Sequence, residues 1–83
     1  MGQRVICTSS AFKHGIEEDA IRHAFTTHIK DVLMEGFDNK YVAIGFDLAG
    51  NPLEVMYNRV DSETVKVFHA MKCRRQFREE LGI

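Results

Sequence analysis

The fold of this chain follows from TVKVFHAMKCRRQFREEL (residues 64–81), where a strand pattern changes directly into a helix pattern. The β-branched residues Val65 and Val67 favour a strand. From Lys72 onward the segment is rich in strong helix formers. These residues therefore predict a strand that runs into a C-terminal helix, with His69 just before the junction.

The predicted C-terminal helix carries a local excess of positive charge. Its cations are Lys72, Arg74, Arg75 and Arg78, and its apolar stripe is Cys73, Phe77 and Leu81. Guanidinium groups beside an imidazole at the end of a sheet are suited to bind phosphate. The simpler alternative is a solvated helix face, on which Arg75 and Glu79 form an ordinary i,i+4 pair.

Length and composition indicate one folded domain, residues 1–83. Apolar residues make up 45% of the chain and charged residues 28%, which are ordinary values for a globular protein. The net charge is −1, so the molecule as a whole is not basic. Any contact with nucleic acid must come from a local patch such as the C-terminal helix.

Several classes of protein are excluded by what the sequence lacks. Cys7 and Cys73 form no CxxC pair, and the four histidines show no metal-ligand spacing, so we expect neither a metal nor another cofactor. The N-terminus has no signal-peptide core, and no apolar run is long enough to cross a membrane. We therefore expect a cytoplasmic protein without membrane contacts.

Two helices are predicted near the N-terminus. Ser9 or Ser10 can cap a short helix that ends at Gly15. The longer helix is IEEDAIRHAFTTHI (residues 16–29), with an acidic first turn and one apolar face. Residues 3–8 are apolar and suit either an edge strand or an extended arm.

The middle of the chain predicts a meander of about four strands. Residues 31–37 read as the first strand, and residues 41–48 alternate between apolar and other side chains. The turn sequence Ala-Gly-Asn-Pro (residues 49–52) returns the chain antiparallel. The predicted fold is α+β, with two N-terminal helices, the first short, an antiparallel sheet of about four strands and a C-terminal helix.

Several side chains allow both a chemical and a structural interpretation. His69 titrates near neutral pH and can act as general base or acid, but it shares strand parity with Val65 and Val67, which indicates a buried role. Tyr41 and Tyr57 could stack on bases, although sheet tyrosines more commonly pack in the core. Glu35 and Glu54 are predicted to face solvent from their strands.

Two segments carry a resemblance to a known family. KHGIEEDAIRHAF (residues 13–25) and VKVFHAMKCRRQF (residues 65–77), with the predicted strands between them, resemble the BrnT-like toxins of bacterial type II toxin–antitoxin modules, whose fold is RelE-like. The ending HA-x-x-x-R-x-x-F, formed by His69, Ala70, Arg74 and Phe77, is similar to that of a divergent actinobacterial branch. The resemblance covers nearly the whole chain from Phe12 on.

The resemblance implies a metal-independent endoribonuclease that inhibits translation and is neutralised by an antitoxin protein. RNA would be its substrate. On this hypothesis the catalytic residues are His69, Lys72, Arg74 and Arg75, and the further RNA-binding residues are Lys13, His14 and Arg78. The alternative is a non-catalytic protein- or RNA-binding module of the same fold. The sequence leaves homo-oligomer formation open.

Overall fold

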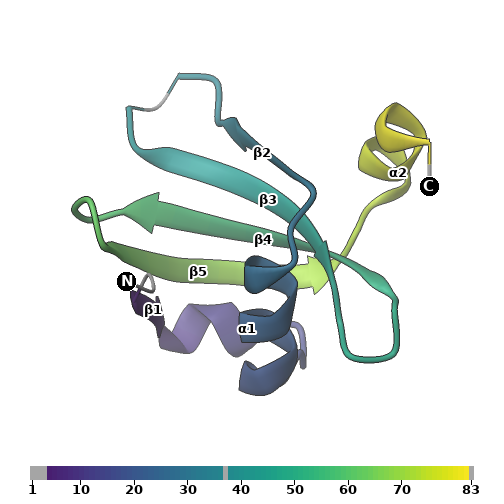
Figure 1. Ribbon diagram of the computed structural model, residues 1–83, viewed down its shortest axis with the longest axis horizontal. Helices are drawn as coiled ribbons and strands as arrows, with labels where there is room; N and C mark the ends of the chain where they lie inside the picture. Colours follow the sequence, from purple (N-terminus) through teal and green to yellow (C-terminus); the bar gives the residue numbers. More distant parts are fainter. Residues whose placement is uncertain (1–3, 37, 83) are drawn as a thin grey trace.

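The computed structural model, which describes residues 4–36 and 38–82, has a small α+β fold with a five-stranded mixed sheet. Its elements are β1 (Arg4–Cys7), the 3₁₀ helix η1 (Ser9–Phe12), α1 (Glu18–Thr26), β2 (Lys30–Leu33), β3 (Lys40–Phe46), β4 (Pro52–Arg59), β5 (Thr64–Lys72) and α2 (Arg75–Leu81). The strand order across the sheet is β1-β5-β4-β3-β2 (Figure 1). Within the described residues, neither α-helix has the length and apolar character needed to cross a membrane.

The α+β class is confirmed, but the predicted helices and strands differ in three details. The predicted first helix is only a 3₁₀ helix, η1, so the described residues hold two α-helices. The predicted all-antiparallel sheet of about four strands has a fifth strand, because β1 pairs parallel with β5, from Arg4 opposite Thr64 to Cys7 opposite Val67. The first strand of the meander, β2, ends at Leu33, and Phe37 lies outside the described residues.

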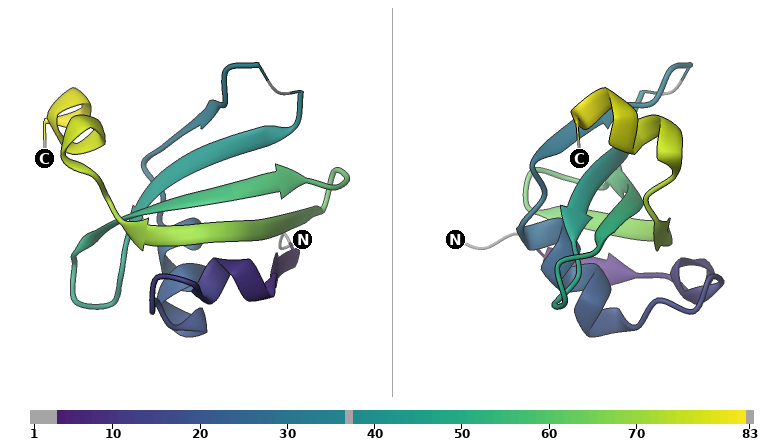
Figure 2. Two further views of the ribbon diagram at one scale, coloured as in Figure 1. Left: turned by 180° about the vertical axis from the view of Figure 1, so that it is seen from behind. Right: turned by 90° about the vertical axis from the view of Figure 1, so that its right-hand side faces the viewer.

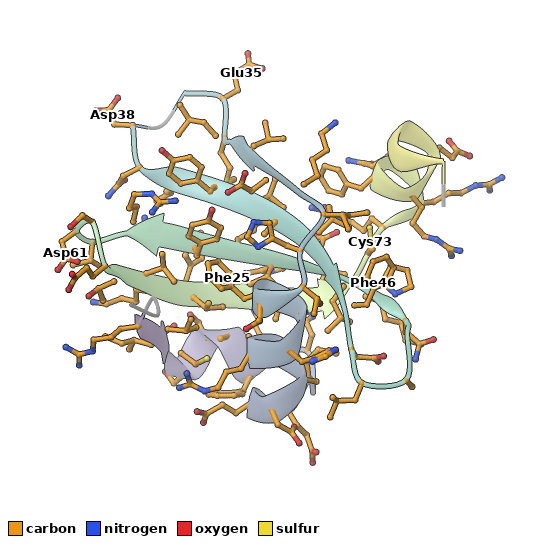
Figure 3. All side chains as sticks on the ribbon, in the orientation of Figure 1. Phe25, Glu35, Asp38, Phe46, Asp61 and Cys73 are labelled. Atoms are coloured by element: carbon orange, nitrogen blue, oxygen red, sulfur yellow. The ribbon has the colours of Figure 1, made fainter. Side chains whose placement is uncertain are left out.

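The hydrophobic core lies between α1 and one face of the sheet. Ile21, Ala24 and Phe25 of α1 are buried there, as their helical spacing predicts. On the sheet side the core holds Tyr41, Ala43, Val55, Tyr57, Val65, Val67 and Ala70. Phe25 lies where α1 meets the sheet (Figure 3) and packs edge-on against the Tyr57 ring at a centroid distance of 5.0 Å. This face supplies most of the apolar burial that stabilises the domain.

The opposite face of the sheet is only partly covered. Helix α2 lies on the far side of the sheet from α1, joined to the end of β5 by a short link (Figures 1 and 2). Val42 and Ile44 of β3 and Met56 of β4 line a cavity on this face. We call it the open face. Because both faces carry apolar residues, the alternation in β3 did not by itself say which set packs against α1.

A β-bulge in β5 controls the direction of His69. Met56 pairs with His69, whereas the next residue of β4, Tyr57, pairs with Val67, so Phe68 is an extra residue on β5. An extra residue reverses the alternation of side chains along a strand. His69 therefore lies on the open face beside Met56, not on the core face with Val67. The prediction that His69 shares a face with Val65 and Val67 was wrong for this reason.

Candidate functional site

The site is organised by Glu54, a carboxylate in the middle of the sheet that is fully buried. Arg74, just before α2, donates to it three times. The Arg74 backbone N–H and side-chain Nε reach Oε1 at 3.1 and 3.0 Å, and Nη2 reaches Oε2 at 2.9 Å. A buried carboxylate requires such partners, because isolated charge is strongly disfavoured in the interior. The prediction that Glu54 faces solvent was wrong.

His69 lies on the other side of the same carboxylate. Its Nε2 is 3.4 Å from Oε2 of Glu54 but is not aligned for a hydrogen bond. Among the side chains that the structure describes, His69 Nε2 is the one buried nitrogen or oxygen without a hydrogen-bond partner. Burial lowers the pKa of His69, and this outweighs the opposite effect of the Glu54 carboxylate. The imidazole is therefore neutral at neutral pH and can accept a proton.

A second histidine reaches the same place from the N-terminal part of the chain. The rings of His14 and His69 have centroids 5.1 Å apart and meet edge to face at 73°. Two side chains of the preceding segment tie it to β5. The Ser10 hydroxyl donates to the Phe68 carbonyl at 2.8 Å, and the Thr8 hydroxyl donates to the Val67 carbonyl at 3.1 Å. Parts of the chain more than 50 residues apart are thereby brought to one site.

The open face beside this cluster holds a cavity of about 410 Å³. Its wall is formed by β2 and the two residues after it, by β3 and β4, and by α2 and the residue before it: Lys30, Val32, Leu33, Met34, Glu35, Val42, Ile44, Met56, Arg74 and Phe77. The Arg74 guanidinium stands over the Phe77 ring, 5.4 Å from its centroid. Glu35 lies at the outer end of the sheet, far along it from Cys73 at the start of the link to α2 (Figure 3). The volume suits a small ligand or a few side chains of a partner.

The structure separates the cations that the sequence grouped together. Only Arg74 lies against His69 and Glu54. Lys72 and Arg78 line a second, smaller depression of about 280 Å³ together with Asn51, Pro52 and Cys73. Arg75 is 91% exposed and pairs with Glu79, as its i,i+4 spacing indicated. Lys13 is exposed beside His14.

The predicted residues thus fall into two groups. His69 and Arg74 meet at Glu54, which sequence reasoning missed, and His14 joins them through its ring contact with His69. Lys13, Lys72, Arg75 and Arg78 surround this cluster at the surface without joining it. The strand pattern gave one weak signal for Glu54, because Met56, on the same face of β4, is apolar and indicates a face not wholly exposed to water.

Fold and site together define a small α+β protein with two histidines beside the ion pair of Arg74 with the buried Glu54, at one end of a half-open sheet. The chain matches no protein-family model, no curated protein and no solved structure. Among the described residues, no three histidine, cysteine or acidic side chains lie close enough together to hold a metal ion.

Proposed function

We propose that the protein is a toxin of the BrnT-like, RelE-like type that cleaves RNA without a metal and inhibits translation in the cytoplasm. The observation that carries this proposal is the contact of His69 and Arg74 with one buried carboxylate, Glu54. Metal-free cleavage requires a base for the 2′-hydroxyl and a cation for the charge that develops on the phosphate. A neutral imidazole beside a guanidinium supplies both.

Arg74 can donate a hydrogen bond to the phosphate while it keeps its hydrogen bonds to Glu54. Its pair with the carboxylate uses Nε and Nη2, and Nη1 takes no part in these bonds. The side chain is 46% exposed and also lines the cavity on the open face. A guanidinium fixed on one edge and accessible on the other is pre-organised to donate to a phosphate oxygen.

The remaining cations are assigned to the backbone of the RNA. Lys72, Arg75 and Arg78 are exposed around the start of α2, and Lys13 is exposed beside His14. Exposed cations attract phosphate over a distance of about 10 Å at moderate salt. This revises the earlier catalytic assignment of Lys72 and Arg75, since neither contacts His69 or Glu54. We expect both to affect binding and its salt dependence more than the chemical step.

The direct test is RNA cleavage by the purified protein in the presence of a metal chelator. Wild type should produce fragments that end in a cyclic phosphate, and His69→Gln should not. His23→Gln is the matched control, because it makes the same substitution at a histidine of α1 outside the cluster. Circular dichroism of each variant reports folding. Intact RNA with folded wild-type protein would refute the ribonuclease proposal.

A non-catalytic binding module of the same fold is the second candidate, and one observation favours it. The Glu54 carboxylate and His69 Nε2 are both buried, while the neighbouring cavity is largely apolar. Such a cavity suits the side chains of a protein partner, and we propose that this partner is an antitoxin. Binding of RNA or of a protein without any cleavage product, in the same experiment, would support this candidate against the enzyme.

A further inference from the structure

His69 presents one nitrogen to the interior and leaves the other for chemistry. Its side chain is 22% exposed, yet Nε2 is buried and lies 3.4 Å from Oε2 of Glu54. The exposed part of the ring is therefore not Nε2. A carboxylate close to one imidazole nitrogen stabilises the imidazolium that forms when the other nitrogen takes a proton. Nδ1 is thus the atom of His69 that is left to act as a base, with Glu54 as its positioning residue.

His14 is a second ionisable side chain beside His69. Its ring touches that of His69 edge to face, and its side chain is exposed to water. Water contact lets it regain a proton from solvent after each turnover. Because the segment before it is anchored to β5 by Ser10, the main chain holds the two rings at the same end of the sheet.

We infer that His14 and His69 form an acid–base pair, in which His69 takes the proton of the attacking 2′-hydroxyl and His14 protonates the leaving 5′-oxygen. This inference rests on the proposed ribonuclease function. The 2′-oxygen forms a bond to phosphorus as the bond from phosphorus to the 5′-oxygen breaks. The products are a 2′,3′-cyclic phosphate and a 5′-hydroxyl. One proton passes to His69 and one leaves His14, so the pair is reset by exchange with solvent.

Other groups at the site are less suited to act as the acid. Arg74 remains protonated at any working pH and is engaged with Glu54. The Glu54 carboxylate is fully buried and accepts three hydrogen bonds from Arg74. Lys72 lies in the second depression, with Arg78. His14 is the exposed titratable group in direct contact with the His69 ring.

The test compares two leaving groups in one RNA. The first probe is a single-stranded oligonucleotide containing a linkage that wild type cleaves. The second is the same oligonucleotide with sulfur in place of the bridging 5′-oxygen at that linkage. A thiolate leaves without protonation, so this substrate requires no general acid. Single-turnover rates at saturating protein separate the chemical step from binding. The variants are His14→Ala, His69→Ala and, as the matched control, His23→Ala, which removes a histidine of α1 outside the site.

We expect His14→Ala to slow cleavage of the oxygen linkage by about 10² to 10³-fold and to leave the sulfur linkage within about threefold of wild type. His69→Ala should slow both linkages, and His23→Ala neither. Equal losses on both linkages, or no loss on either, for His14→Ala would overturn the acid role of His14 while wild-type cleavage still upheld the ribonuclease. If folded wild type cleaves no RNA, no such probe can be made, and the proposed function itself is refuted. His14→Asn repeats the test with a polar side chain if the alanine variant folds poorly.

Discussion

Arg74 holds the buried carboxylate of Glu54 through both carboxylate oxygens, with Nε 3.0 Å from Oε1 and Nη2 2.9 Å from Oε2. The pair joins the link before α2 to the centre of the sheet. Glu54 is fully buried, whereas the Arg74 side chain is 46% exposed. Removal of the arginine would therefore leave a charge in the interior without its main partner, which costs more than the loss of an exposed ion pair.

The first prediction concerns the contribution of the Arg74–Glu54 pair to the stability of the fold. Arg74→Ala should lower the free energy of unfolding by about 3 kcal/mol, because it leaves the Glu54 carboxylate buried and incompletely paired. Arg75→Ala removes a neighbouring arginine from an exposed pair and should cost less than about 0.5 kcal/mol. Urea unfolding followed by circular dichroism measures both. Similar small losses in the two variants would contradict a structural role for the Arg74–Glu54 pair.

The second prediction concerns pH. Burial holds the pKa of His69 below its ordinary value, so the unfolded chain binds more protons than the folded protein at mildly acidic pH. The stability that His69 contributes is fully present above the ordinary histidine pKa of about 6.5 and is lost as the pH falls through and below that value.

Wild type should therefore lose more stability than His69→Gln between about pH 7.5 and pH 5.5, since glutamine does not titrate. Urea unfolding of both proteins at the two pH values measures the difference, and the other titrating groups are common to both. An equal loss in the variant would show that His69 is not the group responsible.

The sequence predicted the elements whose residues interact locally. The apolar face of α1, with Ile21 and Phe25, follows from helical spacing within one segment. The hairpin of β3 and β4 follows from the turn at Gly50 and Asn51. The parallel pairing of β1 with β5 was not predictable in the same way, because its partners lie about 60 residues apart and only the closed fold brings them together.

The site was predicted in part, for a related reason. His69 and Arg74 were selected by their chemistry and their nearness in sequence, and both lie at the site. The bulge at Phe68 has no local sequence signal that we recognised, so the face of His69 was assigned wrongly. Glu54 was missed because a lone glutamate in a strand is normally exposed, and its burial depends on Arg74, 20 residues later.

The third prediction concerns the edge strand β2. The buried Tyr57 hydroxyl donates to Asp31 of β2 at 2.7 Å, which links this edge to the centre of the sheet. Tyr57→Phe should cost about 1 kcal/mol, the usual value of such a hydrogen bond. Amide hydrogen exchange should become faster in β2 more than in β4, since β2 loses its side-chain hydrogen bond to the centre of the sheet. Tyr41→Phe is the matched control, because Tyr41 stacks on Tyr57 across the sheet. Unchanged exchange in β2 in the Tyr57 variant would show that the Tyr57–Asp31 hydrogen bond does not stabilise this strand.

The fourth prediction concerns the close approach of α1 to the sheet at Gly45. A Cβ atom placed there would lie 1.9 Å from the backbone oxygen of Ala24, so helix and strand would have to move apart. Gly45→Ala should lower the free energy of unfolding by about 3 kcal/mol, the upper end for overpacking, because a backbone atom cannot rotate away. Gly50→Ala is the control: its Cβ meets open space, and only its φ of 86° opposes the substitution, at about 1 kcal/mol. Thermal unfolding measures the stability of both variants. A Gly45 variant as stable as the Gly50 variant would show that α1 does not pack this closely against β3.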